Sequence, residues 1–180
     1  MMYALYCHLK GDVEKYHHKL VGEIAKKFGT QITQKENIPA HFTLKGWFGT
    51  ENIKGIDKII AAFCRRHKKT PVRVGGFGGF HPKVIYMDVR LSKEAKKTYF
   101  ELISELRKVE WMSWDKYDAE KRRFHATLAE DCNGNFDAIR QFVKSKERYF
   151  NYQFDNITIL ELVGRHPLLK WKIYKTYSMG

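Results

Sequence analysis

The stretch His41-Phe42-Thr43-Leu44 returns 84 residues later as His125-Ala126-Thr127-Leu128. Each copy lies in a strand-like segment that follows a first strand pattern and a helix pattern, and a second helix pattern comes after it. The chain therefore repeats one strand–helix–strand–helix unit, over residues 3–69 and again over 84–146. Two copies of such a unit are expected to pack about a pseudo-twofold axis that brings the two His-x-Thr-Leu motifs face to face.

The elements around the motifs follow from the spacing of apolar residues and from capping residues. Helices are predicted to begin at Asp12, Thr50, Ser92 and Asn135, the first of them ending at Gly29. Strands are predicted over 3–9, 40–48, 84–90, 123–130, 157–162 and 171–177. A short segment, 72–74, is predicted to pair with 84–90, and the glycine-rich stretch 75–79 is predicted to form a mobile hairpin at the rim of a cleft. The expected fold is α+β, in a single two-lobed domain over 1–180.

The charge balance indicates a polyanionic partner. The chain has 33 Lys and Arg against 20 Asp and Glu, a net charge of +13 and a sequence pI near 9.6. Nucleic-acid phosphates favour such a surface because each contact with Lys or Arg releases condensed counterions. We expect nucleic acid or a small phosphorylated ligand, and the alternative is a soluble protein that is merely basic.

The sequence does not suggest a membrane or an oxidising compartment. No apolar run approaches the ~20 residues that a membrane-spanning helix needs, and the first residues lack the pattern of a signal peptide. Three cysteines, Cys7, Cys64 and Cys132, are an odd number at unrelated spacings, so a disulfide framework is not expected. We expect a cytoplasmic monomer with no membrane contact.

The His-x-Thr spacing has a chemical reason. Side chains alternate along a strand, so His41 and Thr43 share one face, as do His125 and Thr127, while the intervening residues anchor the strand in the core. One neutral imidazole can act as general base while its protonated partner acts as general acid. The threonine hydroxyls can donate to phosphate oxygens, where charge builds in the transition state. We predict that these four residues form the catalytic site, although the sequence does not decide which histidine is the acid.

This pair of motifs resembles the two-histidine phosphoesterase superfamily, and specifically its 2'-5' RNA ligase-like branch of RNA 2',3'-cyclic phosphodiesterases. The resemblance extends to the ending, where residues 157–162 precede 171–174, and so covers essentially the whole chain. It implies a bilobal α+β fold with a central cleft, no metal or other cofactor, and hydrolysis of RNA 2',3'-cyclic phosphates to a 2'-phosphate. It also implies a capacity to join RNA ends through a 2'-5' bond without ATP. The sequence departs from many bacterial members after the second motif, where Ala129-Glu130-Asp131 stands in place of an arginine.

Four further residues are candidates for substrate binding. Lys45 continues the face of His41 and Thr43, and Arg123 precedes His125 on its face, so either could pair with phosphate oxygens. The alternative for each is a solvated strand end. Tyr6 and Tyr86 lie 80 residues apart in matching strands and could stack on a base, or could be ordinary strand residues.

Several alternatives stay open at this stage. Cys64 and His67 share a helical face, but no second pair has zinc spacing. His17, His18 and His166 are interpreted as surface residues. The expected partner is RNA with a 2',3'-cyclic phosphate end or a small cyclic nucleotide. A non-catalytic module that grips RNA ends and a phosphodiesterase for 2'-5' oligonucleotides are the other hypotheses.

Overall fold

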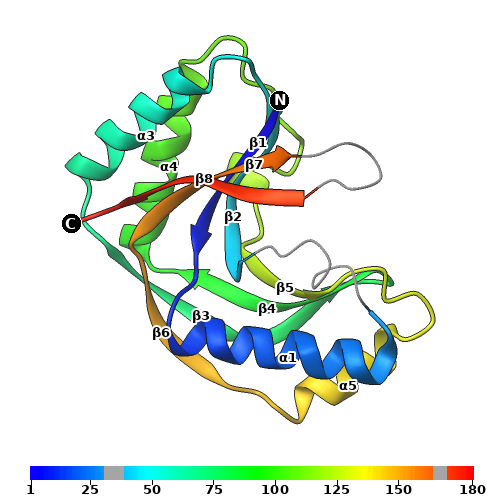
Figure 1. Cartoon of the computed structure of the whole chain (residues 1–180). Helices are drawn as coiled ribbons and strands as arrows, with labels where there is room; N and C mark the ends of the chain where they lie inside the picture. Colours follow the sequence, from blue (N-terminus) through cyan, green and yellow to red (C-terminus); the bar gives the residue numbers. More distant parts are fainter. Residues whose placement is uncertain (31–38, 164–169) are drawn as a thin grey trace.

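Two four-stranded antiparallel sheets form the framework of the protein (Figure 1). The computed structural model describes residues 1–30, 39–163 and 170–180. The first sheet, here sheet A, contains in spatial order β2 (His41–Gly49), β1 (Met2–His8), β7 (Asn156–Val163) and β8 (Lys170–Ser178). The second, sheet B, contains β5 (His125–Ala129), β4 (Val84–Leu91), β3 (Thr70–Phe80) and β6 (Tyr149–Phe154).

The two sheets repeat one arrangement, which confirms the α+β fold with a pseudo-twofold repeat. The motif strands β2 and β5 are the first strands of their sheets, and each pairs with the strand that opens its unit, β1 or β4. The six predicted strands are all present, with ends that differ from the prediction by at most two residues. The duplicated unit therefore positions the two motifs equivalently.

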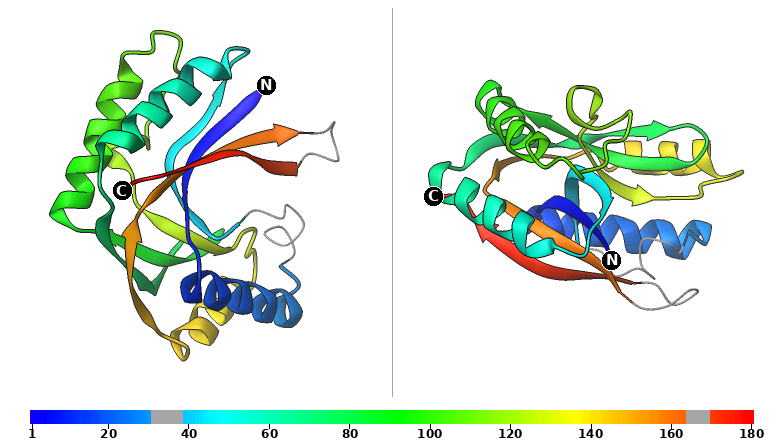
Figure 2. Two further views of the ribbon diagram at one scale, coloured as in Figure 1. Left: turned by 60° about the vertical axis from the view of Figure 1, so that its left-hand side comes forward. Right: turned by 90° about the horizontal axis from the view of Figure 1, so that it is seen from above.

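Four helices of the described chain pack in two pairs (Figure 2). The pairs are α1 (Asp12–Phe28) with α5 (Phe136–Lys144), and α3 (Ile53–Arg66) with α4 (Lys93–Arg107). Gly29 ends α1 in the left-handed conformation, and the Ser92 hydroxyl accepts from the Ala95 amide at 3.1 Å to cap α4. The second helix begins three residues after Thr50. No helix of the described residues is long and apolar enough to cross a membrane.

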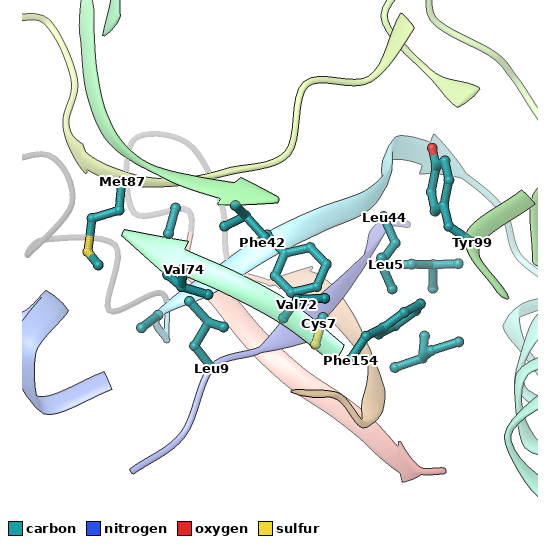
Figure 3. Packing of buried hydrophobic residues seen from close by; sticks show 14 of the residues in the cluster. Leu5, Cys7, Leu9, Phe42, Leu44, Val72, Val74, Met87, Tyr99 and Phe154 are labelled. Atoms are coloured by element: carbon teal, nitrogen blue, oxygen red, sulfur yellow. The ribbon is translucent and has the colours of Figure 1, made fainter. Parts of the chain in front are cut away.

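One hydrophobic core lies behind both motif strands. Every second residue of β1 and β2 enters it, and Leu5, Cys7, Phe42 and Leu44 are all fully buried there. Figure 3 shows these side chains packed against residues of β3 and β6, including Phe154. Because the core takes one face of each motif strand, the histidines and threonines are presented on the other.

The glycine-rich stretch corrects the sequence prediction. Residues 75–79 do belong to a hairpin, but they are part of strand β3, which pairs with β4 on one side and β6 on the other, and not of an irregular loop. At Gly78, a Cβ atom would lie 2.5 Å from the ring of Tyr86. Glycine is therefore needed to leave room for that tyrosine. The sequence prediction also missed β6, although Phe150, Tyr152 and Phe154 alternate with polar residues in it.

Candidate active site

Two histidines on equivalent strands are anchored in the same way. In β2, the Nδ1–H of His41 donates to the carbonyl oxygen of Pro39 at 2.7 Å. In β5, the Nδ1–H of His125 donates to the carbonyl oxygen of Arg123 at 2.8 Å. Because a carbonyl oxygen can only accept, each ring carries its proton on Nδ1 when it is neutral. Nε2 of each ring is then the atom that can exchange a proton with a substrate.

Thr43 and Thr127 accompany the histidines on the same strand faces. In the sheet ladders, Thr43 lies opposite Tyr6 and Thr127 lies opposite Tyr86. Both threonines are half-buried, and neither hydroxyl has a hydrogen-bond partner within residues 1–30, 39–163 and 170–180. Such hydroxyls can donate to the oxygens of a phosphate placed between the imidazoles.

The two tyrosines pack beneath the histidines. The ring of Tyr6 stacks on His41 with centroids 3.9 Å apart and planes 4° apart, and the Tyr86 ring lies 4.8 Å from His125 at 45°. Tyr6 is 6% exposed and Tyr86 is fully buried. This burial contradicts the prediction that they stack on a base, because a base needs an open ring face. They orient the imidazoles instead.

A cavity of about 530 Å³ opens beside His125. Phe80 stands edge-on to that imidazole, with ring centroids 5.1 Å apart at 82°. The guanidinium of Arg123 is exposed at the cavity wall and lies 5.3 Å from the Tyr86 ring. The other lining residues are Tyr117, Lys121 and Arg122. The cationic side chains of this cavity can bind an anionic group of a ligand, and its aromatic side chains can pack against an aromatic group of the same ligand.

The sequence matches the family model of the 2'-5' RNA ligase superfamily over residues 14–165. This chain belongs to the 2'-5' RNA ligase superfamily. The superfamily comprises the two-histidine phosphoesterases, so a phosphoesterase or ligase acting on phosphodiesters is the general class of the protein. No curated protein matches the sequence at a significant level.

Solved structures share the fold of this superfamily member over nearly its whole length. The protein TT0787 of Thermus thermophilus is similar with a TM-score of 0.69 at 12% identity, covering 99% of this chain and 98% of that one. E. coli LigT in complex with NADP+ has a TM-score of 0.61 at 13% identity, covering 98% and 96%. Usb1 of Kluyveromyces marxianus has a TM-score of 0.52 at 13% identity, covering 99% and 98%. At these identities, the likeness establishes the fold.

Lys45 is placed differently from the sequence prediction. A β-bulge in the pairing of β1 with β2 turns both Leu44 and Lys45 into the interior. The Lys45 ammonium lies 2.7 Å from the carboxylate of Asp118, and both side chains are 1% exposed. Lys45 is therefore neither a solvated strand end nor a free partner for phosphate. Arg123 remains exposed at the cavity, and its predicted role in phosphate binding stays a prediction.

Asp118 is a buried carboxylate beside the candidate site that sequence reasoning missed. Its carboxylate accepts hydrogen bonds from Lys45, from Arg122 and from the backbone amide of Asp115. Burial tends to raise the pKa of Asp118, but the hydrogen bonds from Lys45 and Asp115 outweigh it and hold the pKa below its usual range. Arg122 lines the cavity beside His125, so Asp118 fixes one cavity wall to β2.

His17 corrects a second prediction, since it is 5% exposed and not a surface residue. It lies on the face of α1 that packs against β5, and its Nε2–H donates to the Thr127 carbonyl oxygen at 2.7 Å. Burial lowers the pKa of His17 to about 4. His18 is exposed, as predicted, and His166 lies outside the described residues. His17 therefore ties α1 to the backbone of the second motif strand.

Burial lowers the pKa of both catalytic candidates. It lowers the pKa of His41 to about 3, against a raising effect of the hydrogen bond to the Pro39 carbonyl. It also lowers the pKa of His125, and the charges of Arg122 and Arg123 act in the same direction. Both imidazoles are thus neutral in the free protein at neutral pH, and an anion between them would favour protonation of one.

Proposed function

We propose that this chain is a metal-independent phosphodiesterase that hydrolyses the 2',3'-cyclic phosphate ends of RNA to a 2'-phosphate. One observation carries the proposal: His41 and His125 each use Nδ1 to bond a backbone carbonyl oxygen. This leaves Nε2 of each imidazole available for proton transfer. The half-buried Thr43 and Thr127 supply two donors for the non-bridging oxygens. The net charge of +13 suits an RNA ligand.

The reaction follows from these four side chains. One imidazole removes a proton from water as the water oxygen bonds to phosphorus, and the bond from phosphorus to the ribose 3' oxygen breaks. The other imidazole, protonated, donates its proton to that departing oxygen. If an RNA 5'-hydroxyl takes the place of water, the same groups catalyse the same displacement: the 5' oxygen loses its proton to the base and bonds to phosphorus, the bond to the ribose 3' oxygen breaks, and a 2'-5' bond results. Water is far more concentrated than RNA ends, so hydrolysis is the main reaction of the proposal.

A small cyclic nucleotide is the second candidate substrate. The cavity of about 530 Å³ beside His125 has a volume that suits a single nucleotide. E. coli LigT, which shares this fold, has been crystallised with 3'-AMP and with phosphate. Both observations fit either a free nucleotide or the terminal nucleotide of an RNA.

The substrate panel that tests the proposal contains a cyclic-ended RNA, a 2',3'-cyclic mononucleotide and a linear 2'-5' oligonucleotide. In the presence of EDTA, we expect turnover of the cyclic-ended RNA with a 2'-phosphate as product, identified by phosphorus NMR. The physical reason is that two imidazoles can supply both proton transfers. Loss of turnover on chelation, with recovery on adding a divalent metal, would instead establish metal catalysis.

The pH dependence should reflect the lowered pKa values. Below both pKa values the base is protonated, and above both the acid has lost its proton, so kcat/KM should be bell-shaped. Because His41 and His125 both titrate below 6.5, the kcat/KM maximum is expected on the acid side of pH 6.5. The kcat maximum should lie at higher pH, because bound phosphate raises the pKa of the imidazolium. Initial rates across the range from acid to mildly alkaline pH test this, and a kcat/KM maximum on the alkaline side of neutrality would contradict it.

A further inference from the structure

Trp47 of β2 is an unusually open aromatic side chain near the candidate site. It is 62% exposed, whereas most large apolar side chains of the motif strands are buried. Its ring nevertheless has a partner, because it packs against Trp171 of β8 with centroids 5.5 Å apart and planes at 52°. The two indoles come from opposite edges of sheet A, so they meet across the face of that sheet.

The face on which they meet is the face of the catalytic histidine. Trp171 packs in one cluster with Tyr6, Ala4 and Leu160, and Tyr6 is the residue that stacks on His41. The next residue along β2, Phe48, points to the opposite side, into the main core. Trp47 and Trp171, here called the indole platform, therefore continue the surface that carries His41 and Thr43.

The spacing along the sheet fits a neighbouring nucleotide. Ala4 lies beneath the indole platform and Tyr6 lies opposite Thr43, and these two residues are one strand repeat apart, or about 7 Å. On the other side of the reaction centre, Phe80 and Tyr117 line the cavity beside His125. A phosphate between the histidines would thus have aromatic groups on both sides. A cyclic mononucleotide carries one base and can occupy only one of these places.

We propose that the exposed Trp47 ring of the indole platform, backed by the buried Trp171, stacks on a nucleobase, so that the enzyme recognises at least two nucleotides at the cyclic-phosphate end. This inference rests on the proposed function and adds that RNA, and not a free cyclic nucleotide, is the preferred substrate. A base is the occupant that the site favours, because the platform is continuous with the phosphate site of a chain of net charge +13. An aromatic ring accepts any base, so little sequence preference is expected.

The test compares two hydrolysable probes, a dinucleotide that ends in a 2',3'-cyclic phosphate and the matching cyclic mononucleotide. The KM of the full-length protein for the dinucleotide should be about 5- to 150-fold lower than for the mononucleotide, the usual worth of one stacked base. In Trp47→Ala this ratio should collapse towards 1, and Trp47→Phe should retain part of it. Trp111→Ala is the matched control, because Trp111 is 45% exposed but packs near Phe48, which points away from the platform.

Three results would overturn the inference. An unchanged KM ratio in Trp47→Ala would show that no base stacks there. A wild-type dimer that Trp47→Ala converts to a monomer, measured by sedimentation, would make the platform an interface between two copies. A wild-type enzyme that hydrolyses the two probes with equal KM would show that a second nucleotide contributes nothing to recognition. Failure of the proposed function is distinct from all three, because then the wild-type protein hydrolyses neither probe.

Discussion

His41→Ala and His125→Ala are each expected to lower kcat by about 100- to 10,000-fold, the usual contribution of a positioned acid or base. Each substitution removes the Nε2 atom that, in the proposed mechanism, exchanges a proton with water or with the departing ribose oxygen. Both imidazoles stand on strand faces opposite the core, so the variants should fold. Steady-state rates on the cyclic-ended RNA, with thermal unfolding beside them, measure the two effects separately.

The matched control for these variants is His18→Ala. His18 is exposed on α1 and its ring contacts His17, not His41 or His125, so its replacement should leave kcat unchanged. The double variant of His41 and His125 should lose little more than the worse single variant, because acid and base act in one step. Full activity in either single variant, with unfolding unchanged, would refute the paired-histidine mechanism.

Asp118→Asn is expected to lower the free energy of unfolding by about 3–5 kcal/mol, the cost of breaking a buried ion pair by removing one partner. The Lys45 ammonium would remain buried without its carboxylate. For a chain of this size, the loss corresponds to a fall in Tm of about 6–20 °C. Urea unfolding followed by circular dichroism is the direct measurement.

Two further variants show how much of the loss in stability comes from the unpaired Lys45 charge and how much from altered packing. Glu120→Gln removes the carboxylate of an exposed ion pair with Arg107, and should leave the free energy of unfolding nearly unchanged because solvent and salt screen such a pair. Combining Asp118→Asn with Lys45→Met should restore part of the stability, because no unpaired charge is then buried. If Asp118→Asn is as mild as Glu120→Gln, the buried pair does not stabilise the fold.

The sequence predicted the parts of the site that depend on local pattern. Strand alternation placed His41 with Thr43 and His125 with Thr127, and the repeat placed the two strands equivalently. The position of Lys45 could not be predicted, because a β-bulge in β2 turns its side chain into the interior next to Leu44. A second register shift before Phe48 restores the alternation, so the strand pattern fails only locally, at Lys45.

Other features depend on contacts between distant segments. His17 looks like a surface residue of an amphipathic helix until that helix packs against β5. The Asp118 carboxylate meets an ammonium 73 residues away, and no spacing within the chain indicates that pairing. The basic run before the second motif did contain a usable signal, since Arg122 adjoins Arg123 and lines the same cavity. The role of Gly78 required the ring of Tyr86 to be placed first.

The shared core behind β2 and β5 has a mechanical consequence. Protein interiors are close-packed and resist compression, so two strands that back onto the same core cannot slide or tilt independently. The separation of the two imidazoles is thus a stiff dimension of the molecule, set by side chains such as Phe42 and Leu128 and not by a hinge between lobes. In-line attack requires base, phosphorus and acid to stay aligned through the step. In the proposed mechanism, the packed core would hold the two imidazoles at a fixed separation before any substrate arrives.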